Sequence, residues 1–278
     1  MMSQQQACDS PPGELEMQIS SKQVHLYFSW PEQISDQSLL GRYESLLSAD
    51  ERTRMSRFHF ARNRHSYLVT RALIRTSLSA YYPVDPETWR FGTNRYGKPE
   101  ISHPYASLPV RFNLSHTDGL IVCAITRDHA IGVDVEDLHR STQSGLSNLS
   151  SYFSKREAAD LCALPTEQQK HRFFDYWTLK ESYIKARGEG LAIPLGGFSF
   201  HFEADKLKKF TVEPDLLDRA ECWQFWRMAL VDQHGFDQGG ADRYRIALAV
   251  KSSAGKFTVT AVRSTPLRNH VPVPLRFL

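Results

Sequence analysis

The sequence predicts an α+β fold of two similar lobes related by a pseudo-twofold axis, each a small, mostly antiparallel sheet packed with a long helix. The prediction rests on an order of strand, capped helix and long helix that occurs twice. The expected strands start at Val24 and Ile131, 107 positions apart, and two helix-capping serines, Ser48 and Ser154, are 106 positions apart. The alternative to a duplication is that this order recurs by chance, as it can in α+β chains.

The repeat divides the chain into three expected parts. Residues 1–15 are polar, lack the charged and apolar regions of a secretory signal, and are expected to form a disordered leader. Residues 16–130 are expected to form the N-terminal lobe and residues 131–278 the C-terminal lobe. A chain that supplies its own partner lobe does not need to oligomerise, so we expect a monomer.

The strands of the first half are expected where β-branched and aromatic residues gather between turn signals. They are residues 24–30, a strand-and-loop region at 89–101, and residues 110–116 and 120–125. Thr117, Asp118 and Gly119 between the last two are a hairpin signal.

Two helices are expected between these strands. Ser48 and Glu51 match the capping-box pattern and predict a helix that ends near Phe58. A second helix is expected over about residues 61–81, and Pro83 ends it.

The second half repeats this order. Ile131 opens a strand, Ser154 and Glu157 form another capping box, and a long helix is expected from about His171 to the glycine at 188. Later strands are expected at residues 198–202, 243–250 and 257–262, and the proline-rich tail resembles an extended arm.

Composition excludes several classes of protein. The chain has 278 residues, 41% hydrophobic and 12% aromatic, which is enough for proper cores. A formal charge of +3 does not suggest a nucleic-acid partner, and no apolar run approaches the ~18 residues of a membrane span. The four cysteines have neither metal nor disulfide spacing, which suits a reducing compartment. We therefore expect a cytoplasmic protein.

Three carboxylates form a candidate metal site. Asp134 and Glu136 are separated by one residue in a strand, so their side chains point the same way. With Glu181 from the long helix they would provide the oxygen ligands that Mg²⁺ prefers. The alternative is a strand-end Asp and Glu that face solvent.

The long helix carries polar residues in unusual places. Glu181 and Lys185 are four apart, so they are neighbours at the margin of the apolar stripe. Lys180 projects into the stripe itself, and we expect its amine to be buried against a carboxylate or a backbone carbonyl. The alternative is a helix with one surface ion pair and a lysine that reaches solvent.

Basic and polar residues in the first half could meet a phosphate. Arg64, Arg71 and Arg75 lie within about 40° of one another on a helix, and we interpret the row as a wall for one polyphosphate ligand rather than a solvated face. His116, at a strand end, could donate to a phosphate oxygen or act as an acid or base. Taken alone, it would be an ordinary turn histidine. Ser115 points to the opposite face, so no Ser-His-Asp triad is expected.

Four ordered motifs resemble those of 4′-phosphopantetheinyl transferases, of the single-chain, surfactin-synthetase-activating type. They are Tyr96-Gly-Lys-Pro, Phe112-Asn-Leu-Ser-His116, Ile131-Gly-Val-Asp-Val-Glu136, and Trp177-Thr-Leu-Lys-Glu-Ser-Tyr-Ile-Lys185 with the following Gly188-Glu-Gly-Leu191. The resemblance implies transfer of the phosphopantetheine arm of coenzyme A to a serine of an apo acyl, peptidyl or aryl carrier protein, with release of adenosine 3′,5′-bisphosphate. It also implies a cleft between a basic N-terminal lobe, which binds coenzyme A, and a metal-binding, catalytic C-terminal lobe.

The resemblance also implies roles for individual residues. Asp134, Glu136 and Glu181 would hold Mg²⁺, with Mn²⁺ as an alternative, and Glu181 would help to deprotonate the serine. Lys185 and His116 would contact the phosphates, and these two and Glu181 are the expected catalytic residues. Lys98 and Ser115 would contact coenzyme A. Glu51 stands where the family has a basic residue, so recognition of the 3′-phosphate would rest on Arg54, Arg64 and Arg71.

Two other functions stay open at this point. A Mg²⁺-dependent nucleotide phosphohydrolase could use the same carboxylates with water as nucleophile. A non-enzymatic module could use the basic wall to hold coenzyme A. Neither alternative accounts for all four motifs in order.

Overall fold

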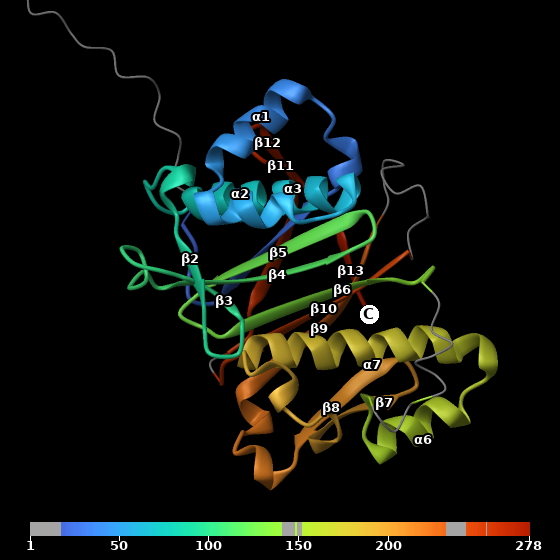
Figure 1. Ribbon diagram of the computed structural model, residues 1–278. Helices are drawn as coiled ribbons and strands as arrows, with labels where there is room; N and C mark the ends of the chain where they lie inside the picture. Colours follow the sequence, from blue (N-terminus) through green and yellow to red (C-terminus); the bar gives the residue numbers. More distant parts are fainter. Residues whose placement is uncertain (1–17, 141–147, 149–151, 232–242, 254) are drawn as a thin grey trace, which may run out of the picture.

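The computed structural model describes residues 18–140, 148, 152–231, 243–253 and 255–278 (Figure 1). The predicted leader, residues 1–15, lies outside them. The α+β fold is confirmed, whereas the pseudo-twofold relation between lobes stays a prediction. No helix in the described part of the chain is both long and apolar enough to cross a bilayer.

Two larger sheets form the centre of the molecule (Figure 1). The first has the order β12-β11-β1-β5-β4 and the second the order β13-β9-β10-β6. Within the first, β1 and β11 are parallel and the other neighbours are antiparallel. The strands are β1 (Gln23–Ser29), β4 (Val110–Thr117), β5 (Leu120–Arg127), β6 (Ile131–Asp137), β9 (Trp223–Leu230), β10 (Tyr244–Lys251), β11 (Thr258–Thr265), β12 (Asn269–Pro272) and β13 (Leu275–Phe277).

Helices cover the outer faces of these sheets (Figure 1). The longer ones are α1 (Gln37–Leu46), α2 (Ala49–Ser56) and α3 (Ala61–Ser79) beside the first sheet, and α7 (Thr166–Arg187) beside the second, with α6 (Lys155–Ala163) on the side of α7 that faces away from that sheet. Both predicted capping boxes are present, at the starts of α2 and α6. The short 3-10 helices are η1 (Pro31–Gln33), η2 (Pro86–Thr88), η3 (Gly190–Ala192), η4 (Leu195–Gly197), η5 (Pro214–Leu216) and η6 (Ala220–Cys222). Two hairpins, β2 (Phe91–Thr93) with β3 (Pro99–Ile101) and β7 (Phe198–Glu203) with β8 (Lys206–Val212), complete the fold.

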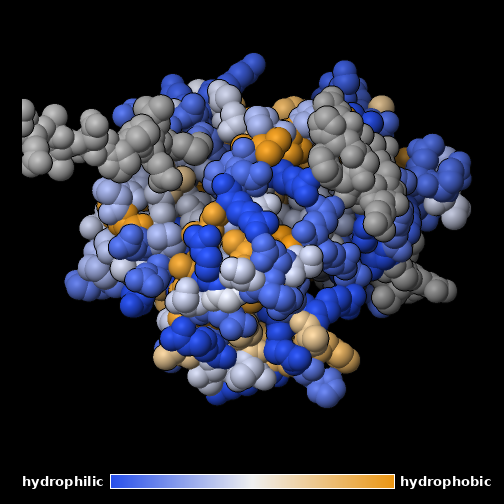
Figure 2. Space-filling model, turned by 90° about the horizontal axis from the view of Figure 1, so that it is seen from above, coloured by the Kyte–Doolittle hydropathy of each residue, from blue (hydrophilic) through white to orange (hydrophobic). Residues whose placement is uncertain are grey.

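The period of two in each strand sorts side chains into three cores. On β5, Ile121, Cys123 and Ile125 pack under α1 and α3, whereas alternate residues of β1, β5, β6 and β10 pack between the two sheets. The opposite face of β10, with Ala247 and Ala249, packs against α7. The order of layers is therefore helix, sheet, sheet, helix. The outer face over α1–α3 is largely hydrophilic (Figure 2).

The two sheets are also joined along one edge by side chains. On β4, alternate residues Asn113, Ser115 and Thr117 accept hydrogen bonds from the backbone N–H groups of Val133, Val135 and Asp137 on β6, at 2.9, 3.3 and 3.3 Å. Side chains thus replace a backbone ladder at this junction. They fix β6, which carries two of the predicted metal ligands, next to β4, which carries Ser115 and His116.

Some elements differ from the expectations. Helix α7 begins at Thr166, directly after Pro165 and about five residues before the predicted start. The prediction missed the first turn because it is polar and carries no apolar signal. Helix α1 was not predicted; Asp36 caps it by accepting from the N–H groups of Ser38 and Leu39. The proline-rich tail forms β12 and β13, which pair with β11 and β9. Strands β8 and β9 were also missed.

The last residues of the chain contribute to both sheets. Strands β11 and β12 lie in the first sheet and β13 lies in the second. Val24 on β1 pairs with Val259 on β11. The predicted division of the chain at residues 130 and 131 stays a prediction. Strands β11 and β12 come after that division in the sequence but lie in the same sheet as β1, β4 and β5.

A buried ion pair fixes α7 on its outer side. Lys180 is fully buried, and its Nζ lies 2.8 Å from Glu157 Oε2 on α6. The same amine donates to the carbonyl oxygens of Leu195 and Phe198, both at 2.8 Å. The expectation that Lys180 is buried against a carboxylate or a backbone carbonyl is confirmed.

Candidate active site

Helix α7 lies directly on β6 at Gly132. A Cβ atom at this glycine would come within 2.0 Å of Ser182 O and 2.4 Å of Ala186 N, so no larger residue fits without movement of the backbone. Asp134 and Glu136 follow Gly132 with the same orientation along the strand. The close approach therefore brings these carboxylates to the part of α7 that carries Glu181 and Lys185.

Asp134 is the centre of a buried polar cluster. Its Oδ1 accepts hydrogen bonds from Ser115 Oγ at 2.9 Å and from Lys185 Nζ at 2.6 Å. Lys185 also donates to Ser115 Oγ at 2.8 Å. Its other oxygen, Oδ2, is buried and has no hydrogen-bond partner among the described residues. Asp134 thus keeps one acceptor available for a donor or a cation.

Glu136 and Glu181 complete a group of three carboxylates. The indole Nε1 of Trp177 donates to Glu136 Oε1 at 3.0 Å, and Arg140 contacts Oε2 at 3.2 Å. Burial, and then the charge of Asp134, raise the pKa of both Glu136 and Glu181. The carboxylates are therefore close enough to repel one another, which a bound cation would relieve.

The three carboxylates do not yet converge on one point. Within the described ranges, no group of three His, Cys, Asp or Glu side chains is arranged to hold a metal ion. Lys185 occupies one oxygen of Asp134, and Trp177 and Arg140 occupy those of Glu136. The oxygen donors suit Mg²⁺, but these contacts would have to rearrange to admit it.

His116 lies at the wall of a cleft next to this cluster. The cleft has a volume of about 910 Å³, and its lining includes Arg54 of α2 and the nearby Phe58, together with His116 of β4 and Glu136 of β6. Desolvation in the cleft, and then the Lys185 ammonium, lower the pKa of His116. A neutral imidazole is therefore favoured near pH 7, and it can donate one hydrogen bond.

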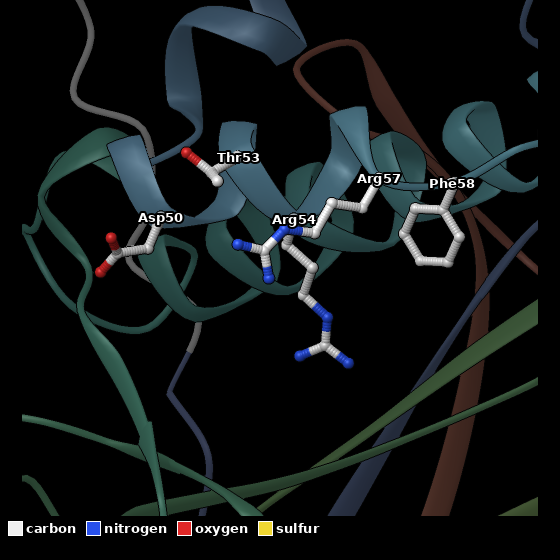
Figure 3. A pocket seen from close by; sticks show the side chains of 5 residues that line it. All are labelled: Asp50, Thr53, Arg54, Arg57 and Phe58. Atoms are coloured by element: carbon white, nitrogen blue, oxygen red, sulfur yellow. The ribbon is translucent and has the colours of Figure 1, made fainter.

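Arg54 lines the same cleft as Glu136 of the acidic cluster. It also lines an adjoining hollow of about 610 Å³ together with Asp50, Thr53, Arg57 and Phe58. In Figure 3 the side chain of Arg54 extends away from α2, toward the strands drawn below it. A guanidinium in such a place is suited to a phosphate group.

The three arginines of the predicted basic wall, Arg64, Arg71 and Arg75, all bond to other groups of the protein. Arg71 and Arg75 both pair with Glu51, and both stack on Phe91 at 4.6 and 5.0 Å. Burial alone would raise the pKa of Glu51, but the charge of Arg71 and further contacts lower it. Arg64 donates to the carbonyl oxygens of Phe58 and His59 at 2.7 and 3.1 Å. Glu51, which stands where the family has a basic residue, therefore joins α2 to α3 through its ion pairs with Arg71 and Arg75.

Lys98 lies apart from the acidic cluster. Its Nζ donates to Ala186 O at 2.9 Å and to Ile131 O at 3.3 Å. Burial lowers the pKa of Lys98 to about 8. Its contact with coenzyme A stays a prediction.

Sequence reasoning did not assign a role to several residues of the site. Trp177, which binds Glu136, is four residues before Glu181, and that spacing could have placed it on the same face of the helix. Asn113 and Thr117 could have been found as the alternate polar residues of β4 on either side of Ser115. Arg140 carries no sequence signal that we can identify.

The fold and the site together define an α+β protein with a cluster of carboxylates and a lysine where two sheets meet, and an arginine in the adjacent cleft. Two family models match the chain. One, described as 4′-phosphopantetheinyl transferase superfamily, matches residues 130–249, and the other, 4′-phosphopantetheinyl transferase, N-terminal, matches residues 34–127.

Relatives agree with these models. The 4′-phosphopantetheinyl transferase HetI of Nostoc sp. is 34% identical over 74% of this chain and 82% of its own length. The 4′-phosphopantetheinyl transferase Sfp of Bacillus subtilis is 34% identical over 59% of this chain and 70% of its own. The corresponding protein gsp of Aneurinibacillus migulanus is 29% identical over 71% and 83%. The chain belongs to the 4′-phosphopantetheinyl transferase family, as the motifs predicted.

Proposed function

We propose that this protein transfers the 4′-phosphopantetheine arm of coenzyme A to a serine hydroxyl of an apo acyl, peptidyl or aryl carrier protein, and releases adenosine 3′,5′-bisphosphate. The observation that carries the proposal is that Arg54 from α2, His116 from β4 and Glu136 from β6 line one cleft. An extended ligand with separated phosphate groups could meet these residues at once.

The chain's own residues would divide the chemistry. Lys185 is a fixed cation beside Asp134, and the neutral ring of His116 is a hydrogen-bond donor at the cleft wall. Both would stabilise charge that develops on the phosphate oxygens during attack. Glu181 would accept the proton of the incoming serine, directly or through water.

The oxygens of Asp134, Glu136 and Glu181 would hold Mg²⁺, or Mn²⁺ in its place. The unsatisfied buried Oδ2 of Asp134 supports this assignment. When bound, the cation would neutralise negative charge on the phosphates. Ser115, bonded to both Asp134 and Lys185, would orient these two side chains.

Arg54 would bind the 3′-phosphate of coenzyme A, since its guanidinium lines the cleft and the adjoining hollow. Arg71 would contribute mainly by holding Glu51, and with it the start of α2. Arg64 would act in the same indirect way, by its bonds to the carbonyl oxygens of Phe58 and His59. In this proposal Arg54 alone contacts the 3′-phosphate, and Arg64 and Arg71 hold the surrounding structure in place.

The test is incubation with coenzyme A, Mg²⁺ and a panel of apo carrier proteins, followed by intact mass spectrometry. We expect one carrier protein or more to gain one phosphopantetheine. Release of adenosine 3′,5′-bisphosphate without any carrier protein would instead indicate a hydrolase. Binding of coenzyme A with neither product would indicate a binding module. The cytoplasmic location and the monomeric state also stay predictions.

A further inference from the structure

The turn between β2 and β3 holds the end of helix α7. The last carbonyl groups of a helix have no partner within it. In α7, Ala186 O accepts from Lys98 Nζ at 2.9 Å, and Gly188 O accepts from Asn94 Nδ2 at 2.8 Å. Both donors come from a turn that is about ninety positions away along the chain. An ammonium at this place also matches the negative end of the helix dipole.

The same turn is fastened internally and packs closely against the helix end. Asn94 Oδ1 accepts from the backbone N–H groups of Tyr96 and Lys98, at 2.9 and 3.0 Å. Gly188 ends the helix in the left-handed region, with φ of 74°. A Cβ atom at Gly188 would lie 2.7 Å from Lys98 Cδ and 3.1 Å from Asn94 Nδ2. The turn and the helix end therefore fit one another without spare room.

Lys98 contacts both elements that carry the carboxylates. Besides Ala186 O on α7, its Nζ donates to Ile131 O at the start of β6, at 3.3 Å. From these points, Asp134 is three residues along the strand and Lys185 is one residue back along the helix. One ammonium thus bridges β6 and α7 at the end of the site where Gly132 sets their closest approach.

We propose that Asn94 and Lys98 are positioning residues for transfer: they cap α7 from the other half of the chain and hold Lys185 and Glu181 in register with Asp134 and Glu136. This inference rests on the proposed function. It gives Lys98 a role through the helix end in place of the expected contact with coenzyme A. A shift of ~1 Å in a catalytic group can cost ~100-fold in rate, so loss of the cap should lower kcat.

The charge on the Lys98 amine strengthens this cap, because charge-assisted hydrogen bonds are stronger and the charge matches the helix dipole. Desolvation dominates its pKa, which is about 8; Glu100 on β3 acts to raise it and Arg111 on β4 to lower it. Because the folded-state pKa is depressed, the charged cap is present at pH 7 and is lost as the pH rises through about 8. Raising the pH of the wild-type protein through about 8 therefore removes the charge of the cap without a substitution.

The test compares wild type with Lys98→Met, which keeps the aliphatic stem, and Asn94→Asp, which keeps the acceptor for the turn and loses the donor to Gly188 O. Lys208→Met is the matched control, because Lys208 lies on β8 and pairs with the exposed Glu203. We expect kcat to fall at least ~10-fold in Lys98→Met and by a smaller factor in Asn94→Asp, while the Kd for coenzyme A changes less than about twofold.

The pH profile supplies a readout that a purely structural role would not move. Wild-type kcat should decline above pH ~8 toward the level of Lys98→Met, which itself stays flat over that limb. If the loss in kcat/KM of Lys98→Met were matched by an equal rise in its Kd for coenzyme A, Lys98 would be a coenzyme A contact and the proposal would be overturned. A wild-type kcat that is flat to pH 9.5, or a loss no greater than that in Lys208→Met, would also overturn the proposal. Absence of transfer by the wild type would instead overturn the proposed function.

Discussion

Replacing Lys180 with methionine should destabilise the protein severely and leave its chemistry intact. Lys180 and Glu157 are both fully buried, with their charged atoms 2.8 Å apart. Leu195 O and Phe198 O accept the other two protons of the ammonium. Glu157 accepts in turn from Ser154 N and Phe200 N, both at 2.9 Å. The pair is thus satisfied on both sides, and removal of one partner leaves a buried charge alone.

Breaking such a pair costs ~3–5 kcal/mol, several times the ~1 kcal/mol of an average substitution. At about 2–4 °C per kcal/mol for a chain of this size, the melting temperature should fall by roughly 6–20 °C. Transfer measured well below that temperature should keep its kcat within about twofold of wild type, because the amine of Lys180 points to the carbonyls of Leu195 and Phe198 rather than to Asp134.

The assay is urea and thermal unfolding of wild type, Lys180→Met, Glu157→Gln and the double variant, with Lys208→Met as control. Glutamine can still accept from Ser154 N and Phe200 N, so Glu157→Gln removes chiefly the charge. We expect the two substitutions to be coupled by ~2 kcal/mol or more. A loss below ~1 kcal/mol in Lys180→Met, or simple additivity in the double variant, would refute the reasoning.

Three further substitutions test the site itself. Glu181→Gln should abolish transfer to a carrier protein while coenzyme A binding and melting temperature stay as in wild type; substantial turnover at saturating Mg²⁺ would contradict the role of Glu181. Arg54→Ala should weaken coenzyme A more than 3′-dephospho-coenzyme A in calorimetry, and equal losses would remove Arg54 from the 3′-phosphate site. Gly132→Ala should lower both stability, by ~1–3 kcal/mol, and kcat, since its Cβ would meet Ser182 O at 2.0 Å. Gly41→Ala is its control, because nothing lies within 4 Å of a Cβ there.

The motifs and the period of two in β6 were enough to predict which residues meet at the acidic cluster. Asp134 and Glu136 share a face because any strand alternates, and Lys185 follows Glu181 by one helical turn. Their partners were less accessible. That Lys98 binds Ala186 O depends on how the β2–β3 turn docks on a helix far along the chain, and no local pattern encodes docking. The pairing of β1 with β11 is of the same kind.

The predicted row of arginines has a partner in space that its spacing in the sequence does not reveal. Arg71 and Arg75 form a row by helical geometry, and a row of like charges predicts a ligand when nothing nearby is known to balance it. Glu51 balances it, from a separate helix. Taken residue by residue, Glu51 was a departure from the family. Seen with its partners, it joins α2, which also carries Arg54, to α3.

Ser115 belongs both to the architecture and to the site, and this limits what its substitution can mean. Its hydroxyl accepts from Val135 N in the junction between the sheets, and the same oxygen contacts Asp134 and Lys185. Thr117 makes a comparable bond to Asp137 N at 3.3 Å and so belongs to the junction. A loss of activity at Ser115 therefore reports on the site only to the extent that it exceeds the loss at Thr117. The catalytic cluster lies where the two sheets meet. A change that disturbs the bonds between β4 and β6 will therefore also disturb the geometry of the cluster.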